Sequence, residues 1–276
     1  MRFSAICIVA LALIGTAGSI STPSQAQASR DATPMPVPIE EWSQAKVIAM
    51  GQEIFRQDTA SWVATDALVA ALGQAGIGEV RGWVVIPEGQ NQRVRFFKPA
   101  ADGVQAGWDV LVTDGRAGAV VPAADGTLSD EETARWNARL TAAANIGTLR
   151  CSQRLNAVVA RDPDSDGWLA WLLTSTTDAN IVPMGGHYRF RISADGRTVL
   201  RRDQLSNTCL NLPKNQAPRG AQSVGLVVSQ IVSAGPVETH VFLSLQNRIS
   251  IYVGAGDRMF AVEGARIRDA SAALRR

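Results

Sequence analysis

Hydrophobic positions are spaced at helical intervals near the start of the chain and at strand intervals over most of the remainder. Apolar residues recur with a helical period from Ile39 to Ile54, and Glu40 and Glu41 fall in the expected first turn, where the helix dipole favours acids. A second helix, or a bent continuation of the first, is expected over residues 59–72. These patterns predict a helical segment ahead of the first strands.

One further helix is indicated by a local capping signal. Ser129 is followed three residues later by Glu132, a spacing typical of a capping box. This spacing predicts a helix from Asp130 to about Asn145.

Short β-type runs, separated by turn residues such as Asp-Gly pairs, make up most of the remaining chain. The expected strands cover residues 82–87, 93–98, 108–113, 155–161, 168–174, 186–193, 197–203, 224–232, 238–245, 249–253 and 259–263. Residues 168–173 are apolar on both faces, which predicts a central strand covered on both sides. The helices are too few for repeated βαβ units. The predicted fold class is therefore α+β, a mostly antiparallel sheet of meanders and hairpins with a few helices packed on it.

The first residues have the layout of a secretory signal peptide. Arg2 supplies a positive charge, residues 6–14 form an apolar run, and Ala26-Gln27-Ala28 is a small-x-small cleavage site. The alternative is an uncleaved membrane anchor, but the apolar run is shorter than the roughly 20 residues that span a bilayer. We expect a signal peptide over 1–28, cleavage near Ala28, and a periplasmic or secreted protein without stable membrane insertion.

The expected domain organisation follows from composition. Residues 29–38 contain three prolines and predict an extended linker. Residues 39–268 are expected to form a single α+β domain, with an alternative division into two helix-plus-meander halves at 39–122 and 129–268. Residues 269–276 are expected to be a frayed tail.

Net charge narrows the classes of partner. Without the leader, whose only charged residue is Arg2, the chain has 26 basic and 25 acidic residues. Near-neutrality gives no electrostatic case for binding nucleic acid or an anionic membrane. No cofactor is expected, and the remaining partner class is an anionic small molecule or a component of the cell envelope.

Two cysteines, Cys151 and Cys209, follow the leader. In an oxidising compartment such a pair predicts a disulfide. The alternative is a Cys2His2 metal site with His187 and His240, the only histidines, but no two of these residues have the close spacing of ligand pairs. We therefore expect the disulfide and no metal.

One polar constellation suggests a binding face. Strand alternation puts His187, Arg189 and Arg191 on one face, and a three-residue turn would place Arg189 opposite Arg201 and His187 opposite Asp203. Facing arginines repel unless a negative group lies between them. We hypothesise that these five residues bind an anionic ligand. The alternative is a solvated strand face with salt bridges to nearby acids.

Other candidate motifs are explained more simply. Residues 162–167 match the first half of a calcium loop, but Leu173 stands at the twelfth position, where a bidentate glutamate is required. A tight acidic hairpin turn is the better interpretation. Asp58 and Asp66 flank a helical stretch and could act as acid and base, although their positions suit capping and exposure better.

The sequence favours a binding role over catalysis. Neither a G-x-S-x-G elbow nor an H-E-x-x-H motif is present. We expect an exported, soluble binding or interaction protein of the cell envelope. The alternatives are a hydrolase that uses His187 and Asp203 with an unidentified nucleophile, and a structural envelope component.

Overall fold

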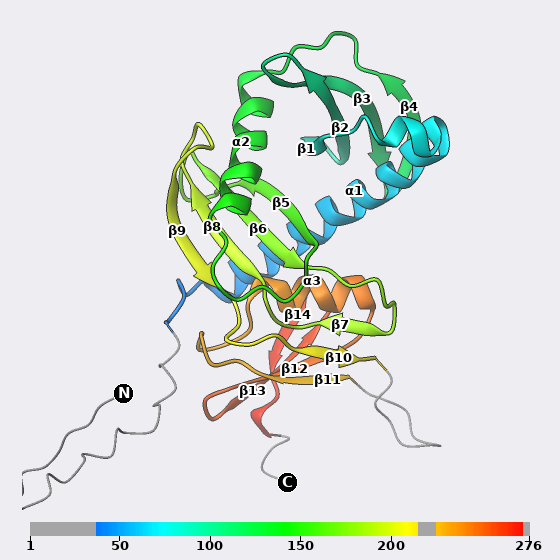
Figure 1. Ribbon diagram of the computed structural model, residues 1–276. Helices are drawn as coiled ribbons and strands as arrows, with labels where there is room; N and C mark the ends of the chain where they lie inside the picture. Colours follow the sequence, from blue (N-terminus) through cyan, green and yellow to red (C-terminus); the bar gives the residue numbers. More distant parts are fainter. Residues whose placement is uncertain (1–36, 215–224, 273–276) are drawn as a thin grey trace, which may run out of the picture. The chain divides into compact units, whose positions relative to one another are not determined.

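The computed structural model describes residues 37–214 and 225–272, and within them it contains three α-helices and fourteen strands (Figure 1). The helices are α1 (Gln44–Ile77), α2 (Asp130–Ala144) and α3 (Glu238–Asn247). The strands are β1 (Gly82–Glu88), β2 (Asn91–Ala100), β3 (Gly103–Thr113), β4 (Arg116–Pro122), β5 (Leu155–Arg161), β6 (Trp168–Thr174), β7 (Ile181–Pro183), β8 (Tyr188–Ile192), β9 (Val199–Gln204), β10 (Asn211–Pro213), β11 (Leu226–Ser229), β12 (Ile251–Ala255), β13 (Arg258–Glu263) and β14 (Arg266–Asp269). The expected signal peptide and residues 29–36 of the expected linker lie outside the described residues.

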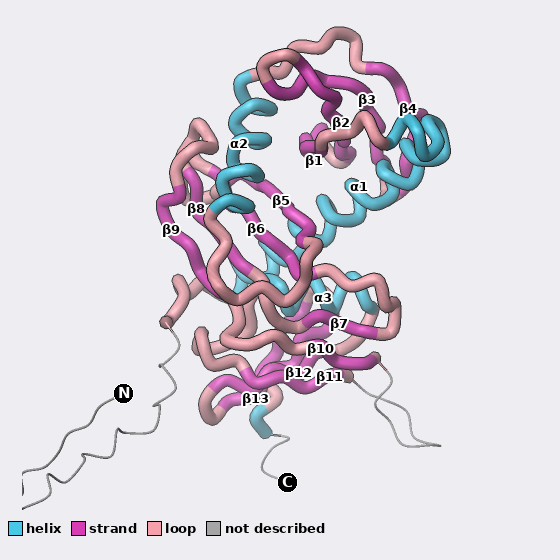
Figure 2. The backbone as a smooth tube through the Cα atoms, in the orientation of Figure 1, coloured by secondary structure: helices cyan, strands magenta, loops and turns pink. Residues whose placement is uncertain are grey.

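The strands form small sheets made mainly of hairpins (Figure 2). Strands β1 to β4 pair in sequence order, β5, β6, β8 and β9 form a second sheet, and β7 pairs with β10. In the last sheet β11 to β14 pair in order, and β11 is parallel to β12. Every other pairing is antiparallel, which confirms the predicted α+β class. The choice between one domain and two halves stays a prediction.

Helix α1 begins later and runs further than the periodicity predicts. Its N-cap is Ser43, whose Oγ accepts the Lys46 N–H at 3.3 Å. The expected start at Ile39 is wrong, because the Ile39 N–H donates to the Val232 carbonyl at 3.1 Å and so belongs to an extended segment. The helix continues through the predicted second segment and bends at Gly73, which has a φ of 66°.

Strand β6 is the centre of the second sheet, as its apolar sequence predicts. Leu169, Trp171 and Leu173 face a core formed with the first half of α1, α3 and the last sheet. The alternate residues, Trp168 among them, face α2 in a second core. Burial on both faces explains why this segment lacks the polar alternation of a surface strand.

Helix α2 shows the predicted capping box, and it links the first two sheets. The Glu132 N–H donates to Ser129 Oγ at 3.2 Å, and the Glu132 carboxylate accepts the Ser129 N–H at 2.9 Å. The same carboxylate accepts hydrogen bonds from Arg95 at 2.9 Å and Arg93 at 3.3 Å, both on β2. The cap therefore also fixes α2 against the first sheet.

The second half of α1 packs on the first sheet and forms a third hydrophobic core with it.

The prediction of a strand over 238–245 is wrong, because this segment is helix α3. Every residue from Glu238 to Ser244 is buried, so the helix shows no polar face and no helical period in its sequence. Helix α1 packs closely on α3 at Gly51, where a Cβ atom would lie 2.7 Å from the Glu238 carbonyl oxygen. The segment forms a helix because it is buried between α1 and the last sheet, although its β-branched and aromatic residues are typical of strands.

Four short or edge strands do not appear among the predicted elements. They are β4, β7, β10 and β14. Strand β14 corrects the expectation of a frayed tail from residue 269: Asp269 ends this strand, and the Ala270 N–H donates to the Met259 carbonyl at 2.7 Å. Residues 273–276 of that tail lie outside the described part of the chain.

The register predicted between β8 and β9 is also wrong. Arg189 lies opposite Asp203, and Arg191 lies opposite Arg201. A bulge after Arg191 shifts the pairing by comparison with a regular three-residue hairpin. As a consequence, an acid rather than a second arginine faces Arg189.

Candidate functional site

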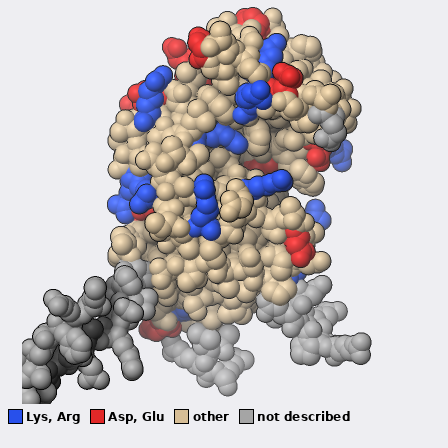
Figure 3. Space-filling model, in the orientation of Figure 1, with Lys and Arg blue, Asp and Glu red and all other residues tan. Residues whose placement is uncertain are grey.

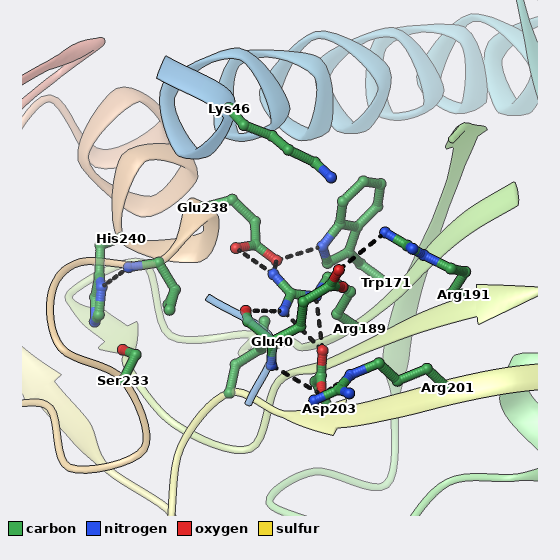
Figure 4. Close-up of polar contacts among 12 residues, drawn as sticks. Glu40, Lys46, Trp171, Arg189, Arg191, Arg201, Asp203, Ser233, Glu238 and His240 are labelled. Atoms are coloured by element: carbon green, nitrogen blue, oxygen red, sulfur yellow. Dashed lines mark hydrogen bonds and ion pairs between the residues drawn. The ribbon is translucent and has the colours of Figure 1, made fainter. Parts of the chain in front are cut away.

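Arg189 lies inside a buried network of charges rather than on a solvated face (Figure 4). Its side chain is 2 % exposed. Nε and Nη2 donate to one carboxylate oxygen of Asp203 at 3.2 and 2.7 Å, and Nη1 donates to both oxygens of Glu238 at 3.2 Å. Nη2 also donates to the Glu40 carbonyl at 2.7 Å, and the guanidinium lies 3.7 Å from the centre of the Trp42 ring. Each nitrogen of the guanidinium therefore has an acceptor.

The two acids of this network are themselves fully engaged. Glu238 accepts the Trp171 indole N–H at 2.9 Å, and Asp203 accepts the Arg201 Nε at 2.9 Å. The two arginines balance the two carboxylates in charge. This network joins β6, β8, β9, α3 and the segment before α1, and its geometry suits cross-linking of the fold.

The other predicted arginines have acidic partners too. Arg191 Nε lies 3.0 Å from Asp162, and its Nη2 lies 3.3 Å from Glu40. Ion pairs that already neutralise these arginines leave little positive charge to attract an anion. The anion-binding hypothesis for His187, Arg189, Arg191, Arg201 and Asp203 stays a prediction.

Both histidines are buried and hydrogen-bonded to the backbone. His187 Nδ1 accepts the Thr174 N–H at 3.1 Å, so its Nε2 carries the proton that it donates to the Pro183 carbonyl at 2.8 Å. His240 Nδ1 accepts the Val237 N–H at 3.0 Å at the start of α3. Burial lowers the pKa of His187 to about 4 and that of His240 to about 3. Both rings are therefore neutral at pH 7, and their hydrogen bonds to the backbone favour a structural role.

The predicted disulfide between Cys151 and Cys209 is present, with Cα atoms 5.3 Å apart. Both sulfurs are consumed in this bond, which excludes the alternative Cys2His2 metal site. Among the described residues, no group of three or more His, Cys, Asp or Glu side chains is arranged to hold a metal ion.

Residues 162–167 form the expected tight turn between β5 and β6, with the Asp162 N–H donating to the Gly167 carbonyl at 3.1 Å.

A pocket of about 760 Å³ lies between α1, the end of β6, β5 and α3. One wall is a face of α1 that carries three polar residues and a tryptophan, namely Asp58, Ser61, Thr65 and Trp62. These residues are three or four positions apart, so they share one side of the helix. The opposite wall carries amides, hydroxyls and a second carboxyl, including Asn156, Gln246, Thr177 and Asp178.

The carboxyl of Asp58 is held by two amides that come from distant parts of the chain. Asn156 Nδ2 on β5 donates to one oxygen at 3.4 Å, and Gln246 Nε2 on α3 donates to the other at 2.9 Å. Burial raises the pKa of Asp58 from its ordinary value of 3.8 to about 6, and the hydrogen bonds from the two side-chain amides only partly oppose this shift. A carboxyl with a strongly raised pKa that lines an open pocket is a candidate functional group.

The sequence position of Asp58 suits capping and solvent exposure better than a role as acid or base. A signal was nevertheless available: a tryptophan follows this aspartate by four residues and is therefore on its side of the helix. Trp62 is 65 % exposed, which is unusual for so large an apolar side chain. Asp66, the other aspartate considered, is exposed and does not line the pocket.

A second pocket of about 630 Å³ lies on another side of α1, against β2, β3 and the β3–β4 turn. Gln52 and Phe55 line it from the helix and Gln92 from the sheet. The Gln92 amide is buried and has no hydrogen-bond partner in the described part of the chain.

Comparisons with known proteins identify no family. No protein-family model matches the sequence, and no curated protein matches it. Among solved structures, a match is the Bacillus megaterium YpeB C-terminal domain, with 9 % identity over 63 % of this chain and 70 % of that chain. Its TM-score of 0.20 is too low to support an inference about fold or function.

The raised pKa of Asp58 predicts that its charge destabilises the fold. Between pH 4 and 6 the folded state keeps a proton that the unfolded chain releases, so the contribution of Asp58 to stability falls as the pH rises through this window. Replacing Asp58 by Asn removes that dependence. We expect the free energy of unfolding of Asp58→Asn, relative to that of wild type, to be about 1–2 kcal/mol higher at pH 7 than at pH 4, so that the variant gains stability; this value is discounted for the partly exposed side chain.

Urea unfolding at the two pH values measures this difference. Asp66→Asn is the matched control, because Asp66 is an exposed carboxylate on the same helix. This variant reports the effect of an Asp-to-Asn change on the same helix outside the pocket. A pH-independent difference for Asp58→Asn would show that Asp58 has an ordinary pKa.

Proposed function

We propose that the protein is an exported binding protein of the cell envelope and that its ligand occupies the Asp58 pocket. The observation that carries this proposal is a half-buried carboxyl with a raised pKa that lines an open pocket. Proteins retain such groups where binding or chemistry requires them. The amides of Asn156 and Gln246 hold this carboxyl in a fixed position, as preorganised binding requires.

Export is supported by two independent features. The disulfide is typical of an oxidising compartment, such as the periplasm or the extracellular medium. Residues 1–28, outside the described part, have the composition of a cleaved leader. Among the described helices, none is long and apolar enough to cross a bilayer.

Binding is favoured over the two alternatives. A hydrolase built on His187 and Asp203 needs a free imidazole, whereas both ring nitrogens of His187 bond to backbone groups. A purely structural component has no need of the Asp58 pocket. Charged side chains of both signs are scattered over the face shown in Figure 3 with wide uncharged areas between them, which suits a small ligand better than a polyanion.

Thermal denaturation with a panel of small molecules tests the proposal. The panel contains neutral oligosaccharides, dipeptides, choline and inorganic phosphate. A ligand at about 100 times its Kd should raise the melting temperature by about 5–10 °C. The shift should fall in Asp58→Asn and persist in Asp66→Asn.

Three other outcomes would count against this proposal. A shift by phosphate that is lost in Arg191→Gln with Arg201→Gln, but kept in Asp58→Asn, would support the anion-binding hypothesis instead. Release of products from a panel member would favour the hydrolase. No shift with any member would argue for a structural component.

A further inference from the structure

We infer that the Asp58 pocket binds a neutral carbohydrate, with Trp62 stacking on the sugar ring and Asp58, Asn156 and Gln246 binding its hydroxyl groups. This inference rests on the proposed function and specifies its ligand.

The aromatic surface is provided by Trp62. This residue lines the pocket and is 65 % exposed, and its ring makes no aromatic or cation–π contact with any described residue. Trp83, which also lines the pocket, differs in being covered by Arg139 at 4.3 Å and packed near Phe96. A free indole face can cover the apolar C–H face of a pyranose ring and remove both from water.

The polar groups around Asp58 match hydroxyl groups, which donate and accept hydrogen bonds together. The amides of Asn156 and Gln246 each use one N–H on Asp58, and their carbonyl oxygens have no partner in the described chain. Each amide thus keeps an acceptor and a second N–H donor, while Asp58 keeps further acceptor sites. Adjacent planar amide and carboxyl groups can bind neighbouring sugar hydroxyls in pairs.

The charge of the pocket disfavours an anionic ligand. Its lining contains the carboxyls of Asp58 and Asp178, and among the described residues that line it Lys214 is the one cation. An acidic sugar or a phosphate would meet like charge at these positions. A quaternary amine could pair with a carboxylate and an indole, but it would leave the amide donors and acceptors unused. A neutral sugar uses all three kinds of group.

Isothermal titration calorimetry of the full chain tests the inference. The saccharide probes are the β-1,4-linked trimer of N-acetylglucosamine, cellotriose and maltotriose, and the comparison probes are choline, glycylglycine and inorganic phosphate. We expect at least one saccharide to bind. Its affinity should fall about tenfold or more in Trp62→Ala, since the stacking contribution of an aromatic ring is of this order. Asp58→Asn should weaken binding as well.

Matched controls locate the binding event. Asp66→Asn on the same helix and Gln52→Ala in the second pocket should keep the wild-type affinity within about twofold. Binding should also persist in 0.5 M salt, about threefold or more above physiological ionic strength, because a neutral ligand gains little from long-range charge attraction. Circular dichroism of each variant checks that the fold is retained.

The remaining outcomes distinguish an error in the ligand class from an error in the binding site. If choline or glycylglycine binds with the same dependence on Trp62 and Asp58, the carbohydrate inference is wrong and the proposed pocket stands. If a saccharide binds but is lost in Gln52→Ala and not in Trp62→Ala, the site is the second pocket and the inference is wrong. If none of the probes binds, both the inference and the proposed function are overturned.

Discussion

Arg189→Ala should lower the free energy of unfolding by about 3–5 kcal/mol, because it removes one member of a buried charge network, leaves Glu238 without a cation and leaves Asp203 with only the half-exposed Arg201. Asp203 and Glu238 are 4 % and 0 % exposed, so neither can recover its hydrogen bonds from water without local opening. The substitution also removes the cation over the Trp42 ring. Urea unfolding followed by tryptophan fluorescence measures the loss.

Arg201→Ala is the matched control on the same acid. Arg201 donates to Asp203 at 2.9 Å, but its side chain is 45 % exposed, so its ion pair is screened by solvent. We expect this change to cost less than about 1 kcal/mol. Equal losses for the two variants would mean that the Arg189 network behaves as an ordinary surface ion pair. Replacing Glu238 by Gln in the Arg189→Ala background should recover part of the loss, since it removes one unpaired charge.

The Arg189 network could not be derived from the pattern of β8 alone. Alternation correctly places Tyr188 and Phe190 in one core, and it puts Arg189 on the opposite face. That face is covered as well, by α3 and the segment before α1. Because α3 is buried on all sides, its sequence does not show a helical period, and the helix that supplies Glu238 was predicted as a strand. The sequence therefore gives no sign that a buried acid on α3 pairs with Arg189.

Elements with strong local signals were predicted almost to the residue. The bounds of β5 and β6 match the predicted runs, and the capping box gave the start of α2. These elements depend on apolar runs and a cap that are read within a few residues. The short strands β7 and β10 depend on partners that lie far away in sequence, and no local pattern reports them.

One wall of the candidate pocket could be predicted from local sequence, and the other wall could not. Its α1 wall is visible in the sequence as polar residues and a tryptophan at helical spacing from Asp58 to Thr65. Its other wall combines Asn156 and Gln246, which lie about 100 and 190 positions from Asp58. Only the packing of α3 and β5 against α1 brings these amides to the carboxyl and excludes enough water to raise its pKa.

Replacing both Cys151 and Cys209 by Ser should lower the free energy of unfolding by about 4 kcal/mol. The disulfide joins residues that are 58 positions apart, and the chain between them contains β5, β6, β8 and β9, which make up the whole second sheet. The cross-link restricts the unfolded chain over this length, so its removal gives the unfolded state more conformations. The measurement is urea unfolding of wild type and the double variant in oxidising buffer.

Reduction provides the control for this substitution. Dithiothreitol should destabilise the wild type by a similar amount and leave the double variant unchanged, because the described chain contains no other cysteine. The native contacts beside the bond should be unaffected, since Cys151 and Cys209 lie in segments outside the strands. If the double variant matched oxidised wild type in stability, the bond would contribute nothing to folding. If reduction also destabilised the double variant, the effect of the reductant would have to come from elsewhere in the chain.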